Sequence, residues 1–234
     1  MRFPKDLFPV LLLTIVAIHA NTRVHAGIVA YSGFDGNLEG WTSNTPSEVS
    51  WQMTGGNPGG YAQFVDGSSG DSLFLAPSSF LGDLRILDGS GTLTYDHRLV
   101  QLGSQPNGVV PLEVRLSGPG GEANWLGEIP AEGLLWNQII VPFQQSAWNV
   151  VGGSWGDVLS NVTSFRIRFE LVDNAFRGPT NRETVAIDNV TLTANPVPEP
   201  SAIVSMIIAG VVGAAFRMRQ RRLLGVSRAK PLGE

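Results

Sequence analysis

Hydrophobic and polar residues alternate with a period of two along the middle of the chain. In "TLTYDHRLV" (92–100), one face carries Leu93, Tyr95, His97 and Leu99. The segment "PLEVRLSG" (111–118) alternates in the same way, with an apolar set of Leu112, Val114 and Leu116. This spacing is typical of a strand with one buried face. Clusters such as "GGNPGG" and "SGPGGE" separate the runs and predict turns.

Many short strands with polar outer faces predict an all-β fold, an antiparallel sandwich rather than a parallel α/β sheet. The cleanest strand is "SFRIRFELVD" (164–173). Its expected inward residues are Phe165, Ile167, Phe169 and Leu171, and its expected outward residues are Arg166, Arg168 and Glu170. His97 lies on an inward face, which favours a core residue over a ligand.

The last strand, "TVAIDNVTLTA" (184–194), changes its rhythm. Val185 and Ile187 occupy odd positions, whereas Val190 and Leu192 occupy even ones. One inserted residue, a β-bulge near Asp188, produces such a shift of face. A strand that is buried on both faces is the alternative interpretation.

The N-terminal segment has the order of a secretory signal peptide. Arg2 and Lys5 precede an apolar stretch (7–18), and small residues follow in "VHA". We predict a signal peptide over 1–26 with cleavage after Ala26. An uncleaved signal anchor is the alternative, although about twelve apolar residues interrupted by Pro9 make a poor permanent span.

Charge and composition narrow the function of the remaining domain, 27–194. Residues 27–195 contain seven arginines, no lysine and seventeen acidic residues, so the formal charge is 7 − 17 = −10. Such a domain repels phosphate backbones, which disfavours nucleic-acid binding, and it favours hard cations such as calcium. The chain has no cysteine. Thiol catalysis, thiolate zinc sites and iron–sulfur clusters are therefore excluded.

Catalytic signals are weak. The sequence "GGSWG" (152–156) matches the pattern of a serine nucleophile elbow around Ser154, but His97 is the one histidine of the domain and precedes the motif. No spacing singles out a pair of acids for glycoside hydrolysis. We expect a plain loop at Ser154 and a non-enzymatic protein, with a hydrolase as a less favoured alternative.

Several stretches together resemble the laminin B (laminin type IV A) domain. They are "FDGNLEGWT", "GNPGGYAQFVD", "APSSFLGD" followed by "GTLTYDHRL", "VRLSGPGG" and "AIDNVTL". The resemblance implies a jelly-roll sandwich of the galactose-binding kind, and by itself no reaction. Related jelly rolls often hold structural calcium, and the matching positions are Asp35 and Asp188. The alternative is that Asp35 forms a turn and Asp188 caps a bulge.

Jelly rolls of this kind also bind sugars through exposed aromatic side chains. The six tryptophans make sugar binding conceivable, but sandwich cores also use tryptophan, so none is assigned to a ligand.

The C-terminal segment, 195–222, resembles the PEP-CTERM sorting signal of Gram-negative bacteria. It combines the motif Pro198, Glu199 and Pro200, an uncharged helix over 202–216, and a basic cluster formed by Arg217, Arg219, Arg221 and Arg222. The cluster is expected to hold the helix end and the tail, 223–234, in the cytoplasm. The resemblance implies processing by the membrane protease exosortase. An ordinary tail anchor is the alternative.

These features predict an exported, non-enzymatic protein of the cell surface or extracellular matrix. It is first a membrane-anchored precursor and is then released or transferred by exosortase. The alternative function is a carbohydrate-binding module for exopolysaccharide. Structural calcium is the one cofactor expected.

Overall fold

The computed structural model describes residues 27–67, 70–103, 108–172 and 182–194. The predicted signal peptide, sorting motif, membrane helix and basic cluster lie outside the described residues. Within the described ranges, no helix is long and apolar enough to cross a bilayer. Residues Ala26–Asn195 form a compact unit.

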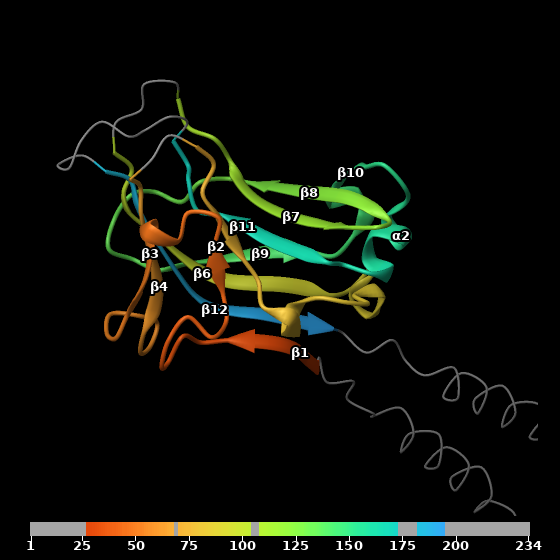
Figure 1. Ribbon diagram of the computed structural model, residues 1–234, viewed down its shortest axis with the longest axis horizontal. Helices are drawn as coiled ribbons and strands as arrows, with labels where there is room; N and C mark the ends of the chain where they lie inside the picture. Colours follow the sequence, from red (N-terminus) through yellow and green to blue (C-terminus); the bar gives the residue numbers. More distant parts are fainter. Residues whose placement is uncertain (1–26, 68–69, 104–107, 173–181, 195–234) are drawn as a thin grey trace, which may run out of the picture. The chain divides into compact units, whose positions relative to one another are not determined.

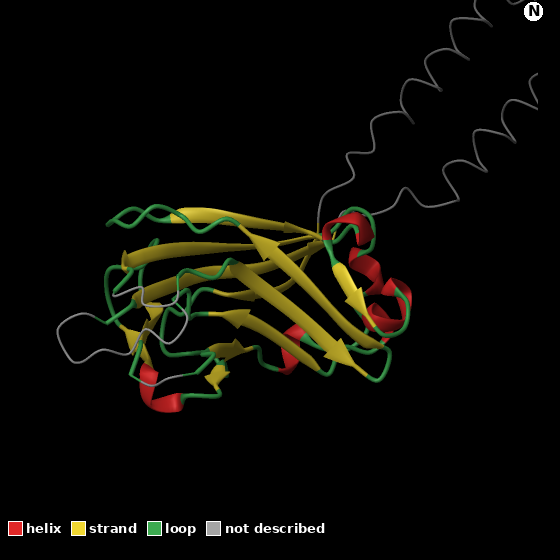
Figure 2. Ribbon diagram, turned by 90° about the horizontal axis from the view of Figure 1, so that it is seen from above, coloured by secondary structure: helices red, strands yellow, loops and turns green. Residues whose placement is uncertain are grey.

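The domain consists of two antiparallel sheets of six strands each (Figures 1 and 2). Sheet A has the order β3-β4-β12-β6-β9, with β1 also paired to β12, and sheet B has the order β10-β8-β7-β11-β5-β2. The strands of sheet A are β1 (Gly27–Ser32), β3 (Val49–Gln52), β4 (Tyr61–Val65), β6 (Thr92–Gln101), β9 (Asn137–Pro142) and β12 (Thr184–Ala194). The strands of sheet B are β2 (Thr42–Ser43), β5 (Leu73–Leu75), β7 (Leu112–Gly118), β8 (Gly121–Gly127), β10 (Asn149–Val151) and β11 (Ser164–Arg168). The predicted all-β, antiparallel class is confirmed.

Short helical segments connect the strands. They are the 3-10 turns η1 (Pro46–Glu48), η2 (Ser78–Phe80), η3 (Arg85–Leu87) and η4 (Gln145–Ala147), and the α-helix α2 (Trp155–Ser160). Several of them gather at one end of the strands (Figure 2). Among the described residues, no long helix covers either sheet. The outer faces of both sheets are therefore formed by side chains of the strands themselves.

The inner faces of the two sheets share one core. Trp41 is stacked on Phe74 with ring centroids 4.6 Å apart, and its Nε1 donates to Ser32 Oγ at 2.9 Å. The predicted inward sets of β6, β7 and β11 are all buried, including His97. The core belongs entirely to the compact unit, so this unit has what it needs to fold by itself.

One predicted outward residue is wrong. Glu170 is buried rather than exposed. Strand β11 ends at Arg168, and beyond it the chain leaves the alternating pattern, so that the carboxylate of Glu170 accepts a hydrogen bond from the backbone N–H of Ser72 at 3.0 Å. Periodicity fails here because the strand had already ended.

The predicted bulge in β12 is confirmed. Its register with β6 shifts between Asp188 and Thr191, and Asn189 has a φ of 51°. Ala186 and Asp188 are also fully buried, so the strand is covered on both faces as well. Both interpretations of the sequence, a bulge and burial on two faces, are therefore correct. The bulge directs the Asp188 carboxylate toward the loop between β3 and β4.

Candidate functional site

A polar face covers the outer side of sheet B. Register places one row of side chains across four neighbouring strands, in the order Asn149, Asn124, Arg115 and Arg166. Glu113, Glu122, Ser117 and Arg168 flank this row from the same three central strands. We call these eight side chains the polar face. Neighbouring strands lie about 4.8 Å apart, so the row presents hydrogen-bonding groups at regular steps.

Ion pairs hold the polar face in place. Glu113 is bound by Arg115 Nη2 and by Arg168 Nη2, each at 2.7 Å from one carboxylate oxygen. Glu122 lies 3.9 Å from Arg115 Nε and 3.8 Å from Arg166 Nη2. Because the Glu113 side chain is only 6% exposed, these contacts are less screened by solvent than ordinary surface pairs. The guanidinium groups are therefore fixed before any ligand arrives.

A few atoms beneath the polar face are buried without a hydrogen-bond partner. Within the described part of the chain these include Arg166 Nε, Arg168 Nε and Asn124 Oδ1, which solvent does not reach. Three guanidinium groups are matched by three carboxylates, those of Glu113, Glu122 and the neighbouring Asp71, which lies 3.2 Å from Arg168 Nη2. The formal charge of this surface is thus zero, although the domain as a whole is strongly acidic.

A second polar site surrounds Asp188 on sheet A. Its two carboxylate oxygens accept hydrogen bonds from the backbone N–H groups of Asn57 at 2.6 Å and Asn189 at 2.7 Å. The side-chain amides of both asparagines donate to Asp96 Oδ2, at 3.0 and 2.9 Å. Burial, with a smaller effect from the carboxylates of Asp96 and Asp35, raises the pKa of Asp188 to about 6.

The structure brings the two predicted calcium ligands to the same loop. A methyl group added at Gly56 would lie 2.7 Å from Asp188 Oδ2, and one added at Gly59 would lie 2.8 Å from Asp35 Oδ1. Both carboxylates therefore face residues 56–59. Among the described residues, no group of three or more acidic or histidine side chains is arranged so that it could hold a metal ion by itself. The donor set fits calcium only if backbone carbonyls complete it, and calcium remains a prediction.

An aromatic clasp holds this loop. The guanidinium of Arg98 lies 5.0 Å from the centroid of the Tyr61 ring and 4.4 Å from that of Trp136. Its Nη1 donates to the carbonyl of Gly55 at 3.2 Å. This hydrogen bond attaches the loop that supplies Asn57 to Arg98 of sheet A. The two cation–π contacts hold the Arg98 guanidinium in its position.

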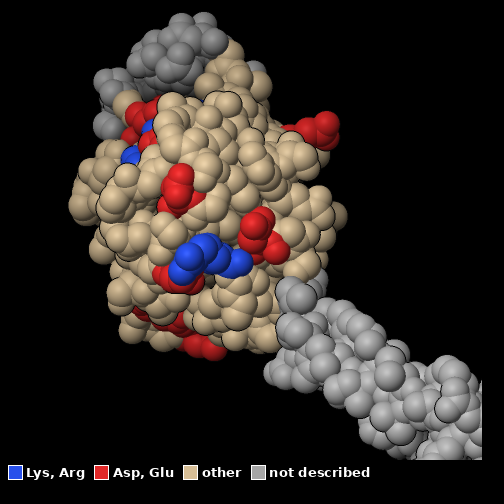
Figure 3. Space-filling view, turned by 90° about the vertical axis from the view of Figure 1, so that its right-hand side faces the viewer, with Lys and Arg blue, Asp and Glu red and all other residues tan. Residues whose placement is uncertain are grey.

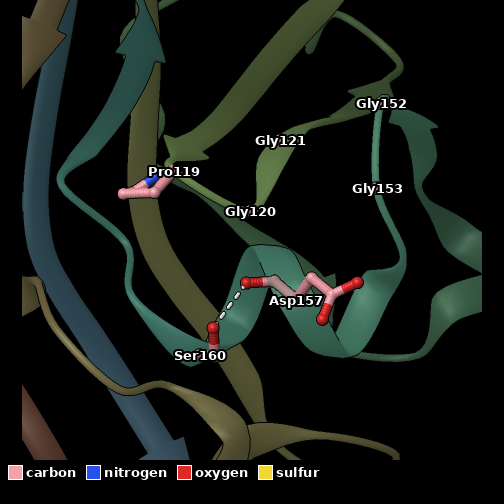
Figure 4. A pocket seen from close by; sticks show the side chains of 7 residues that line it. All are labelled: Pro119, Gly120, Gly121, Gly152, Gly153, Asp157 and Ser160. Atoms are coloured by element: carbon pink, nitrogen blue, oxygen red, sulfur yellow. Dashed lines mark hydrogen bonds between the residues drawn. The ribbon is translucent and has the colours of Figure 1, made fainter.

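In the structure, Ser154 of the serine motif caps a helix instead of lying in the expected plain loop. Ser154 is the N-cap of α2 and exchanges hydrogen bonds with Asp157 in a capping box. His97 is buried in the core, where burial lowers its pKa to about 4. The hollow beside this helix is lined by Pro119, Gly120, Gly121, Gly152, Gly153, Asp157 and Ser160 (Figure 4). The Asp157 side chain is already bound to Ser154, so the hollow presents mainly glycine backbone.

Charged side chains are few on the face shown in Figure 3, and basic and acidic ones lie beside each other near its centre. The exposed ion pair of Arg85 with Asp83 is an isolated one, in which Asp83 has its pKa lowered to about 2 by hydrogen bonds from Arg85. It contrasts with the interlocked pairs of the polar face and offers a matched control for them.

Sequence reasoning missed a cluster of buried carboxylates formed by Glu48, Asp66, Glu170 and Glu183. Glu48 accepts hydrogen bonds from Gly67 N and Ser72 Oγ, and Glu183 accepts from two backbone N–H groups. Burial raises the pKa of Glu170 to about 7 and that of Glu183 to about 8. No local signal identifies the cluster, because its members come from four separate segments.

Solved structures of similar fold share little sequence with this chain. The L4b domain of human laminin alpha-2 matches with a TM-score of 0.48 and 11% identity, over 72% of this chain and 98% of that domain. A family 11 carbohydrate-binding module of a Clostridium thermocellum cellulosomal cellulase matches with a TM-score of 0.45 and 13% identity, over 76% and 99% of the two chains. The CBM22-2 xylan-binding domain from Paenibacillus barcinonensis Xyn10C matches with a TM-score of 0.42 and 13% identity, over 71% and 99%.

No protein-family model matches the sequence, and no curated protein is a significant match. Likenesses at this level assign no ligand and no activity to this chain. Support for a function therefore lies in the arrangement of the chain's own side chains.

Proposed function

We propose that this chain is an exported, non-enzymatic carbohydrate-binding protein whose ligand lies across the polar face of sheet B. The observation that carries the proposal is the row of Asn149, Asn124, Arg115 and Arg166, held in register across four strands. Such a row offers fixed donors and acceptors along a line. An extended polysaccharide fits this arrangement, because each of its sugar units carries hydroxyl groups that can hydrogen-bond with successive side chains of the row.

The charge of the polar face favours a neutral glycan. Its three arginines are balanced by Glu113, Glu122 and Asp71. A polyanion would meet no net positive charge there and would be repelled by the acidic domain around it. Neutral hydroxyls, in contrast, accept from guanidinium groups and donate to carboxylates in the same plane.

Export and sorting belong to the same proposal and rest on the sequence. The signal-peptide pattern over 1–26 supports export, and the order of Pro198, Glu199 and Pro200, an apolar segment and an arginine cluster supports recognition by exosortase. A protein that is delivered to the cell surface or matrix by this route meets exopolysaccharide there. The absence of a serine–histidine arrangement around Ser154 in the described residues supports binding rather than hydrolysis.

The test is binding of the compact unit Ala26–Asn195 to a panel of neutral and acidic polysaccharides. Replacement Arg166→Ala removes a guanidinium whose Nη2 donates to Ser117 Oγ at 2.9 Å, on a side chain that is 23% exposed. A charge-assisted hydrogen bond contributes about 1.5–3 kcal/mol, so affinity should fall about tenfold or more. The control is Arg85→Ala, which disrupts only the exposed pair with Asp83 and should bind as the wild type does.

Absence of binding to every polysaccharide in the panel would overturn the proposal. Binding that Arg166→Ala leaves unchanged would place the ligand elsewhere on the domain. Stronger binding to acidic than to neutral polymers would contradict the argument from charge.

A further inference from the structure

A face without charge covers the outer side of sheet A at the end where the domain begins and ends. Two cross-strand rows form it, Ile28–Thr193–Thr92–Pro142 and Tyr31–Thr191–Thr94–Ile140. Each row crosses β1, β12, β6 and β9, of which β1 and β12 lie side by side in Figure 1. We call these eight side chains the threonine face, since its centre consists of four threonines.

Apolar side chains project from both edges of the threonine face. Ile28 is 69% exposed, Tyr31 53% and Ile140 56%. Val29, the extra residue at the register shift of β1, is also exposed. Single exposed apolar residues are ordinary, but several on one uncharged sheet face form a patch of the kind that contacts a partner or a membrane.

The ends of the domain indicate which partner contacts the threonine face. Gly27 and Ala194 are register partners at the ends of β1 and β12, so the chain enters and leaves the domain beside this face. Seven residues, 195–201, separate Ala194 from the uncharged segment 202–216. Seven fully extended residues reach at most about 25 Å. Three of the seven are prolines, which restrict the backbone and favour an extended linker.

We propose that the threonine face rests on the surface of the lipid bilayer while the chain is anchored by segment 202–216. This inference depends on the anchor of the proposed function and adds an orientation to it. Ile28 and Ile140 have the apolar character, and Tyr31 the amphipathic character, of side chains that settle at the boundary between headgroups and acyl chains.

The surroundings of the face define the kind of lipid. Beyond Tyr31 and Thr94 the next row contains Asp188 and Asp96, both carboxylates. With a domain charge of −10, an anionic lipid surface would repel this region. The bilayer surface that fits is therefore zwitterionic. Such an orientation leaves the polar face, on the other sheet, turned away from the lipid.

The test exploits the lack of cysteine in the chain. Single cysteines are introduced as Ile28→Cys and Ile140→Cys on the threonine face, and as Val151→Cys on the outer side of sheet B, where Val151 is 53% exposed. The full chain is labelled with an environment-sensitive fluorophore and reconstituted in phosphatidylcholine vesicles that contain a quencher-labelled lipid. The two threonine-face probes should be quenched several-fold more strongly than the probe at Val151.

Equal quenching at all three sites, or none at any site, would overturn the inference. A probe response at Ile28 that depends on protein concentration and persists without vesicles would also overturn it, in favour of a second copy as the partner. Failure of the chain to float with the vesicles would remove the anchor on which the inference rests. Polysaccharide binding by the soluble unit Ala26–Asn195 does not depend on that anchor, so the two failures are distinguishable.

Discussion

The buried carboxylates predict that the domain loses stability as the pH rises above neutrality. Glu183 is fully buried, and its carboxylate oxygens accept from Leu171 N at 2.7 Å and from Val172 N at 3.2 Å. Burial, with a smaller effect from the carboxylates of Glu170 and Asp66, raises its pKa to about 8. In the unfolded chain a glutamate has a pKa of about 4.3.

The sign follows from proton binding. Between the unfolded and folded pKa values the folded state holds a proton that the unfolded state has released, so stability decreases as the pH rises through this range. From pH 7 to the folded pKa of about 8 is about one pH unit, so the expected loss of unfolding free energy is on the order of 1 kcal/mol. Glu170, with a pKa of about 7, contributes in the same direction. His97, with a pKa lowered to about 4, stays neutral in the folded state over this range.

The perturbation is Glu183→Gln, which keeps a neutral hydrogen-bonding side chain and removes the titration. Urea unfolding of the unit Ala26–Asn195, followed by tryptophan fluorescence at pH 7 and pH 9, measures the effect. Wild type should lose on the order of 1 kcal/mol or more between the two pH values, and Glu183→Gln should lose clearly less. Asp83→Asn is the control, because Asp83 is exposed and ionised throughout this range.

Two results would refute the reasoning. Wild-type stability that is constant or rises from pH 7 to pH 9 would show that the cluster is not protonated at neutral pH. A Glu183→Gln variant with the full wild-type slope would assign the titration to another group.

Three further predictions concern other parts of the chain. If Asp188 and Asp35 share a calcium ion, free calcium at about a hundred times its dissociation constant should stabilise the unit Ala26–Asn195 by about 2.7 kcal/mol; equal melting temperatures with calcium and with a chelator, or a calcium shift that survives Asp188→Ala, would remove the ion from this site. Trp41→Ala should cost about 3–5 kcal/mol in urea unfolding, because Trp41 fills the centre of the aromatic core, and a cost no larger than that of Trp136→Ala, at the partly exposed clasp, would contradict this. Replacing Glu199 should leave the protein in the inner membrane with its arginine tail attached, whereas an intact C-terminus in the extracellular wild-type protein, found by mass spectrometry, would exclude processing.

The sequence by itself predicted β6, β7, β11 and β12 and the apolar face of each. Alternation in 92–100, 112–118 and 164–169 predicted which apolar side chains are buried, because burial on one face of a strand repeats every second residue and is therefore visible locally. The change of rhythm in β12 likewise predicted the bulge, since one inserted residue moves every later side chain to the other face. The charge of the domain also needed no structure.

Only the tertiary structure decided which side chains meet. Arg115, Arg166 and Asn124 form one row because of the register between β7, β8 and β11, and register depends on pairing between segments that are far apart in sequence. Glu170 was expected outside and is inside, because the end of β11 and its contact with Ser72 are tertiary events. The threonine face also depends on register, because it combines side chains from four strands. The sequence of any one of these strands does not show which side chains will be its neighbours. Periodicity reports how one strand is buried, whereas a binding surface is made by neighbours across strands.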